Sequence, residues 1–221
     1  MRTRFLCGVI AIASSIGAAG TSGLNAAVVV IQSSSFVLRQ DAQESIYLYP
    51  TLGFQSTSYN GTTSAIKLTA GANGLQASDE HTGRVASLTP YGSFATKFAS
   101  DSLIESSDFT GSDVIKYLYQ PGGGVKNQFT LGGSSGYIGF SFVDSSSLTH
   151  YGWARVSVRD ALAGIVPTPS YEMTLYEWAY ETVANTAIAA GAVSSIPEPA
   201  ADSALAGLGV LGLCWLRRKK R

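Results

Sequence analysis

The chain has 221 residues with 15 Lys or Arg and 15 Asp or Glu, so its formal net charge is zero. Seven basic and two acidic residues lie in the terminal segments 1–27 and 194–221, so residues 28–193 keep 15 − 7 = 8 basic and 15 − 2 = 13 acidic residues, a net charge of −5. This acidic balance argues against binding of nucleic acid or anionic lipid through charge.

The amino terminus has the layout of a secretory signal peptide. Two arginines within the first four residues precede an apolar run over 5–19 that ends in small residues. We predict that residues 1–27 are a signal peptide exported through the Sec translocon. Cleavage after position 19, 26 or 27 fits the alanines there, and 26 or 27 is favoured because a β-prone run begins at Val28. A retained N-terminal anchor is the alternative.

Residues 28–193 have the size of one domain that can bury a core without covalent staples. Both cysteines, Cys7 and Cys214, lie outside this region, which therefore has no disulfide, thiolate nucleophile or cysteine-ligated metal. Aromatic residues, Val, Thr, Ser and Gly are plentiful and helical periodicity is scarce, which indicates an all-β class. We predict a single antiparallel β-sandwich, jelly-roll-like, and assign it no metal or cofactor.

The first half of this region alternates β-prone runs with turn residues. The Asn60-Gly61 pair predicts a tight hairpin turn, because both residues accept positive φ. We expect the run that follows it to be the return strand of that hairpin, and the polar, glycine-containing residues 71–82 to form a loop. The expected strands are 28–31 and 36–38, separated by a serine turn, then 46–49 and 65–69.

The second half contains the clearest structural unit. Residues 137–142 and 153–159 alternate apolar and polar side chains with period two across the short polar segment 144–147. They predict an antiparallel hairpin with one buried face. A third strand is expected over 173–180, with Tyr176, Trp178 and Tyr180 on one side, and the segment 187–191 closes the domain.

Few residues offer chemistry. An acidic stretch suggests calcium through its oxygen ligands, but its spacing is not that of an EF-hand, so a solvated acidic loop is preferred. The glycine runs 121–124 and 132–136 lack the Gly-Lys-Ser/Thr ending of a phosphate loop and are interpreted as turns. The members of the acidic stretch are Asp101, Glu105, Asp108 and Asp113.

His81 and His150 are the only histidines, and no Gly-x-Ser-x-Gly elbow accompanies them. Asp79 and Glu80 precede His81, but neighbouring strand residues point to opposite faces. A triad assembled from distant residues is the alternative that would make the protein a secreted hydrolase. We expect no enzyme activity.

The carboxyl terminus carries the most specific pattern. Pro197, Glu198 and Pro199 form a rigid, extended tripeptide. Residues 204–216 follow without a charge, and as a helix they reach about 20 Å. The hydrocarbon core of a bilayer is about 30 Å thick. The helix therefore spans it only if flanking residues contribute or the bilayer thins locally. By the positive-inside rule the basic tail stays cytoplasmic and residues before Pro197 lie outside. The tail is Arg217, Arg218, Lys219, Lys220 and Arg221.

This order of tripeptide, short apolar helix and basic tail resembles the PEP-CTERM sorting signal of exopolysaccharide-producing Gram-negative bacteria. The resemblance implies recognition and removal of the signal by exosortase, a membrane protease-transpeptidase. The expected product is an ectodomain released from an inner-membrane precursor to the cell surface or extracellular matrix. The motifs at 136–140, 150–153 and 177–181 also resemble the ectodomain ending of many such proteins.

The resemblance raises carbohydrate binding as one alternative for the ectodomain. Four aromatic residues could stack on sugar rings of an exopolysaccharide if they line one exposed face. The competing interpretation is that they fill the core of the sandwich, and we prefer it. The sequence thus predicts an exported protein with a structural or matrix-associated ectodomain. The candidate glycan contacts are Tyr151, Trp153, Tyr176 and Trp178.

Overall fold

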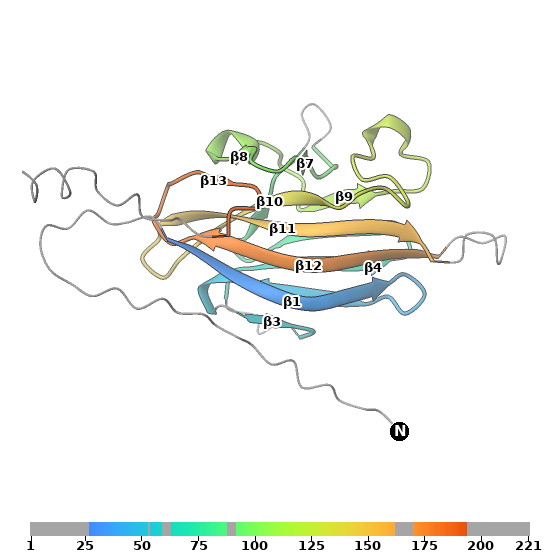
Figure 1. Ribbon diagram of the computed structural model, residues 1–221, viewed down its shortest axis with the longest axis horizontal. Helices are drawn as coiled ribbons and strands as arrows, with labels where there is room; N and C mark the ends of the chain where they lie inside the picture. Colours follow the sequence, from blue (N-terminus) through green and yellow to red (C-terminus); the bar gives the residue numbers. More distant parts are fainter. Residues whose placement is uncertain (1–26, 53, 59–62, 88–91, 162–169, 194–221) are drawn as a thin grey trace, which may run out of the picture.

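The computed structural model describes residues 27–52, 54–58, 63–87, 92–161 and 170–193 (Figure 1). The predicted signal peptide up to residue 26, the Asn60-Gly61 turn, the Pro-Glu-Pro tripeptide, the apolar run 204–216 and the basic tail lie outside these ranges. The described residues form antiparallel sheets, which confirms the all-β class. They also contain three short 3-10 helices, η1 (Pro50–Leu52), η2 (Ser106–Asp108) and η3 (Gly124–Lys126). Within these ranges no helix is long and apolar enough to cross a membrane.

The larger sheet has the strand order β1-β12-β11-β10-β6, with β7 also paired to β10. The long strands β10, β11 and β12 follow one another in the sequence and lie side by side. The predicted hairpin and the strand after it are therefore confirmed. The bounds are β1 (Val28–Arg39), β6 (Arg84–Val85), β7 (Lys97–Phe98), β10 (Gly136–Val143), β11 (Thr149–Asp160) and β12 (Tyr171–Glu181).

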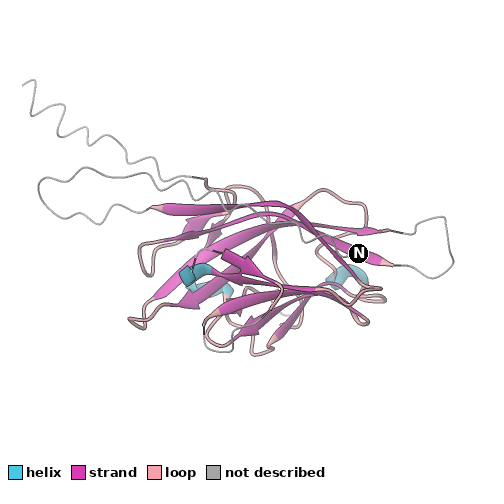
Figure 2. Cartoon of the chain, turned by 90° about the horizontal axis from the view of Figure 1, so that it is seen from below, coloured by secondary structure: helices cyan, strands magenta, loops and turns pink. Residues whose placement is uncertain are grey.

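A second sheet has the order β3-β2-β4-β5-β9, and a small sheet pairs β13 with β8. The five-stranded sheet forms the second layer of the domain (Figures 1 and 2). Its strands are β2 (Ser45–Tyr49), β3 (Phe54–Ser56), β4 (Ala65–Gly71), β5 (Gly74–Glu80) and β9 (Ile115–Tyr119). The small sheet consists of β8 (Leu103–Ile104) and β13 (Ile188–Ala189).

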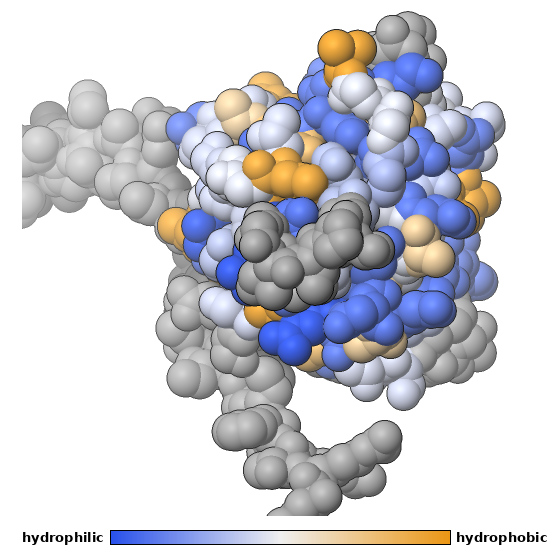
Figure 3. All heavy atoms as spheres, turned by 90° about the vertical axis from the view of Figure 1, so that its right-hand side faces the viewer, coloured by the Kyte–Doolittle hydropathy of each residue, from blue (hydrophilic) through white to orange (hydrophobic). Residues whose placement is uncertain are grey.

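The two larger sheets bury one apolar core between them. Alternation along each strand directs every second side chain into this space. The core takes Leu48, Ile66 and Leu68 from one sheet, and Phe140 and Trp178 from the other. Outside, Figure 3 shows separate hydrophobic spots on a largely hydrophilic face.

One position in this core requires glycine. Gly152 on β11 lies directly opposite Phe140 on β10. A Cβ at Gly152 would lie 2.3 Å from the Phe140 ring and 2.6 Å from the carbonyl oxygen of Ala179. The missing side chain therefore lets the aromatic ring lie against the β11 backbone.

A second, smaller core covers the other face of β10, β11 and β12 at one end. Residues of β8, β13 and the loops around them pack there against Tyr151 and Trp153. The larger sheet is thus buried on both faces in this region, whereas further along β11 the outer residues Arg155 and Arg159 are partly or fully exposed. This explains why consecutive residues in the first part of β11 are buried whichever face of the sheet they lie on.

The strand predictions fail in three places. β1 is a single strand through the serines at 33–35, with a register shift between Gln32 and Phe36. Residues 71–82 contain the strand β5 in place of the expected loop. β4 is a strand as expected, but it is not the return strand of a hairpin with β3. It pairs with β2 and β5, while β3 pairs only with β2. The polar outward residues of β5 conceal its alternation, since only Leu75 and Ala77 are apolar and buried.

Candidate functional site

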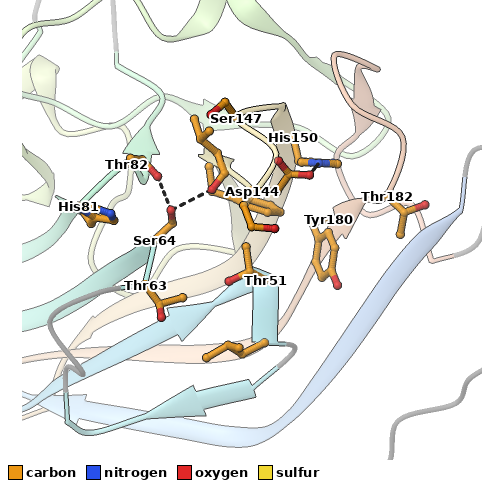
Figure 4. Close-up of a pocket in the computed structure, with 14 residues that line it drawn as sticks. Thr51, Thr63, Ser64, His81, Thr82, Asp144, Ser147, His150, Tyr180 and Thr182 are labelled. Carbon is orange, nitrogen blue, oxygen red and sulfur yellow. Dashed lines mark hydrogen bonds and ion pairs between the residues drawn. The ribbon is translucent and has the colours of Figure 1, made fainter.

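One end of the domain is hollowed into a pocket of about 720 Å³. It is lined by η1, the start of β4, the turn after β5, the β10–β11 turn and the end of β12 (Figure 4). The lining is rich in hydroxyl groups, with one carboxylate, two imidazoles and two aromatic rings. Its polar and aromatic members are Thr51, Thr63, Ser64, His81, Thr82, Phe142, Asp144, Ser145, Ser147, His150, Tyr180 and Thr182.

His150 is fixed by contacts at both ring nitrogens. Its Nδ1 lies 3.0 Å from the carbonyl oxygen of Glu181, and its Nε2 lies 3.3 Å from Oδ2 of Asp144. The ring also stacks on Phe142, with centroids 5.2 Å apart. Because both nitrogens face acceptors, the two hydrogen bonds form together only when both nitrogens carry a proton.

Asp144 places a carboxylate in the pocket wall and closes the β10–β11 turn. Its Oδ1 accepts hydrogen bonds from the backbone N–H groups of Ser146, at 2.8 Å, and Leu148, at 2.9 Å. The Leu148 N–H, followed by the His150 side chain and the Ser146 N–H, holds the pKa of Asp144 below its ordinary value. These groups favour the ionised carboxylate.

Ser64 and Thr82 form a separate polar contact in the pocket. The Ser64 hydroxyl donates to the carbonyl oxygen of Val143 at 3.0 Å and is hydrogen-bonded to the Thr82 hydroxyl. His81 is exposed and has a positive φ of 58°. Figure 4 shows His81 and His150 on opposite sides of Ser64, and in the described part of the chain no hydrogen bond joins Ser64 to either ring. Both histidines therefore line the pocket, but neither forms a hydrogen bond with Ser64.

The four candidate glycan contacts do not line one exposed face, which is the condition that the glycan-binding alternative set for them. Trp178 is 0% exposed in the main core, while Trp153 at 0% and Tyr151 at 6% lie in the second core. Tyr176 lies on the outer face, where its hydroxyl is 3.0 Å from Ser157 Oγ and the Arg155 guanidinium lies over its ring. The preferred interpretation, that these aromatics fill the core, holds for three of the four.

A β-bulge explains why Tyr176 separates from its neighbours. The β11–β12 register passes from Arg155 opposite Glu177 to Val156 opposite Leu175, so Tyr176 has no opposite residue. An extra residue in one strand reverses the alternation beyond it. Trp178 and Tyr180 then point inward while Tyr176 points outward, contrary to the prediction that the three share a side.

The acidic stretch is used for local structure. Asp108 Oδ2 accepts the Glu105 backbone N–H at 2.9 Å, and Asp113 accepts the Ser93 hydroxyl. In the ranges that the structure describes, no three His, Cys, Asp or Glu side chains gather as metal ligands would. The calcium alternative thus gains no support from geometry.

Sequence reasoning missed the role of Asp144 and its pairing with His150. The signal was present, since an Asp before a run of serines favours a side-chain-to-backbone turn. Ser64 and Thr82 carry no such signal, because they meet only once β4 pairs with β5, and Thr182 joins the same pocket from the end of β12.

Comparison with known proteins identifies the carboxyl terminus. Residues 195–219 match the family model of the PEP-CTERM protein-sorting motif, in agreement with the resemblance that the sequence predicts. No curated protein matches the chain, and no solved structure does.

Proposed function

We propose that this chain, which carries a PEP-CTERM sorting motif at 195–219, is an exported precursor that an exosortase-type enzyme processes at its carboxyl terminus. The inner membrane holds the precursor through residues 204–216 with the basic tail inside. Processing leaves a structural or matrix-associated β domain at the cell surface. The observation that carries this proposal is the motif itself, which follows closely on a β domain whose described residues end at 193.

The test is mass spectrometry of the native protein in membrane, outer and secreted fractions. Outer material that ends near Pro197 to Pro199 and lacks 204–221 is the expected result. Glu198→Ala is expected to accumulate in the membrane with its tail intact. Asp202→Asn, which removes a nearby charge and keeps the tripeptide, is the matched control. Mature outer protein that still ends at Arg221 would contradict the proposal.

We further interpret residues 28–193 as one jelly-roll-like β-sandwich. The shared core between the two larger sheets supports this. So does the order β1-β12-β11-β10, in which the first strand lies beside the last of three consecutive strands, as in a Greek key. One cooperative unfolding transition of the purified fragment 28–195 is expected. Two separate transitions would show two independent units.

A second candidate function is carbohydrate binding in the pocket. It is favoured by the Asp144 carboxylate, the hydroxyl groups of the wall and the Tyr180 ring, which together suit a polyhydroxylated ligand. Retention of the protein on host exopolysaccharide is the test. Thr51→Val and Tyr180→Leu are expected to weaken retention, and Tyr176→Leu, outside the pocket, is the control. A wild-type protein that is not retained would rule the idea out.

The proposal assigns no catalysis to the domain. The contacts of His150 with Asp144 and Glu181, and of Ser64 with Val143 and Thr82, support this, since each group is already engaged. Assay of the fragment against glycans and esters tests it. Hydrolysis that Ser64→Ala abolishes would support the secreted-hydrolase alternative instead.

A further inference from the structure

Lys116 is a buried lysine without a hydrogen-bond partner. It lies on β9, where alternation places it with Leu118 on the side that faces the core. The residue is 1% exposed, and its Nζ atom forms no hydrogen bond with the described residues. Burial of an unpaired ammonium group is costly. Accordingly, burial lowers the pKa of Lys116, which favours the neutral, nucleophilic amine.

Asp79 lies diagonally across the sheet from this lysine. Ala77 on β5 is directly opposite Lys116, and Asp79 is two residues further along the same face of β5. The Asp79 backbone N–H donates to the carbonyl oxygen of Val114 at 2.9 Å, so the strand pairing continues to this point. Diagonal neighbours in a sheet lie about 7–8 Å apart, within reach of a long side chain.

The Asp79 carboxyl group is held in place and partly protonated near neutral pH. Its Oδ1 accepts the Val85 backbone N–H at 2.8 Å. Burial raises the pKa of Asp79 to about 6, against the opposing effects of that hydrogen bond and of Lys116 and Arg84. The lowered pKa of Lys116 and the raised pKa of Asp79 both favour the forms that react to an amide, and both side chains lie on the same face of the sheet.

We propose that Lys116 and Asp79 become joined by an intramolecular amide bond between Nζ and Cγ. The Nζ lone pair attacks Cγ and forms the C–N bond. One carboxyl oxygen then leaves as water, with its own proton and one proton from Nζ. Amine and acid thus give amide and water, with no change in oxidation state and no other reactant.

Bond formation requires a side-chain rotation. Among the described ion pairs none joins Lys116 to Asp79, so Nζ and the carboxylate oxygens lie more than 4.0 Å apart. The four-methylene stem of lysine spans the diagonal when it extends along the sheet. Lys116 is buried and Asp79 is half-buried, which limits the access of water to the amine.

The bond would covalently join β5 to β9 across the turns and loops between residues 79 and 116. The only cysteines are at 7 and 214, so no disulfide can supply such a staple to the domain. The inference does not depend on the proposed sorting or on the pocket.

Peptide mapping of the native protein, purified from its own host and denatured before digestion, tests the proposal. Trypsin cleaves after Lys67, Arg84, Lys97, Lys116 and Lys126 when these side chains are free. With the amide bond in place, cleavage after Lys116 is blocked. We then expect a branched species in which peptide 68–84 is joined to peptide 98–126, lighter than the two together by one water molecule.

Variants locate the bond. Lys116→Arg and Asp79→Ala are each expected to abolish the branched species, whereas Lys67→Arg, on the opposite face of its sheet, retains it. Recovery of peptides 68–84, 98–116 and 117–126 from the wild type, without the branched species, overturns the proposal. This wild-type result decides the matter even if a variant fails to fold.

Discussion

Replacement of Trp178 by alanine tests whether this aromatic residue belongs to the core or to a binding surface. The side chain is 0% exposed and lies opposite Ile31 on β1 and Ala154 on β11. Its ring contacts Phe140, with centroids 6.2 Å apart. Truncation of a buried Trp costs about 3–5 kcal/mol, which is a third or more of the free energy of unfolding of many domains.

Trp178→Phe is the informative companion. The Trp178 Nε1–H has no hydrogen-bond partner among the described residues, and an unpaired buried donor costs about 1–3 kcal/mol. Phenylalanine keeps much of the buried ring and removes this donor. We therefore expect Trp178→Phe to be at least about 2 kcal/mol less destabilising than Trp178→Ala.

The assay is guanidinium unfolding of fragment 28–195, followed by far-ultraviolet circular dichroism, because tryptophan fluorescence changes with the substitution itself. Tyr176→Phe serves as the control on the outer face, since it loses only the hydrogen bond to Ser157, about 1 kcal/mol. A Trp178→Ala variant within about 1 kcal/mol of the wild type would refute the assignment of this residue to the core.

Three further predictions concern packing, pH and charge. Gly152→Ala forces a Cβ into the Phe140 ring and should lower the free energy of unfolding in urea by about 1–3 kcal/mol. The control is Gly92→Ala, whose Cβ would meet nothing closer than 3.9 Å and which should cost under about 0.5 kcal/mol. Equal losses would show that the Phe140 contact is unimportant. The pKa of Asp144 is lowered, so its contribution to stability is present above its ordinary value of 3.8 and is lost as the pH falls through the lowered value. Wild type should therefore lose more stability than Asp144→Asn between about pH 5 and about pH 2, and parallel pH profiles would contradict this reasoning. Glu172, 4% exposed, is bound by Arg39 Nε at 3.0 Å and Arg159 Nε at 2.7 Å. Removal of either exposed arginine alone should lower the free energy of unfolding by about 0–1 kcal/mol. The double variant Arg39→Ala, Arg159→Ala should lose more than the sum of the two single losses, because it leaves a buried carboxylate without a cation. Additive losses in this double-mutant cycle would argue against the reasoning.

The strongest sequence predictions rest on local patterns. The alternation of 137–142 and 153–159 fixed the hairpin of β10 and β11, because a half-buried strand must alternate whatever its distant neighbours are. The sorting motif was equally readable, since Pro-Glu-Pro, an apolar run and a basic tail are recognised by their order along the chain. Neither inference needs knowledge of tertiary contacts.

The candidate site depended on contacts that a local pattern does not contain. Period-two alternation says which residues share a face, but it does not say what covers that face. Trp153 is buried because β8, β13 and the segments around them pack over its side of the sheet. Tyr176 turned outward because a single bulge reversed the alternation.

Chain order and composition by themselves determined that this protein is β-rich and carries a C-terminal sorting motif. Only the tertiary structure brought His150 to Asp144 at the pocket and placed Lys116 diagonally across from Asp79. The physical reason is that strand pairing is non-local. The partner of a strand is chosen by the burial of the whole sheet, so the meeting of two distant polar groups appears only once every strand has its neighbour.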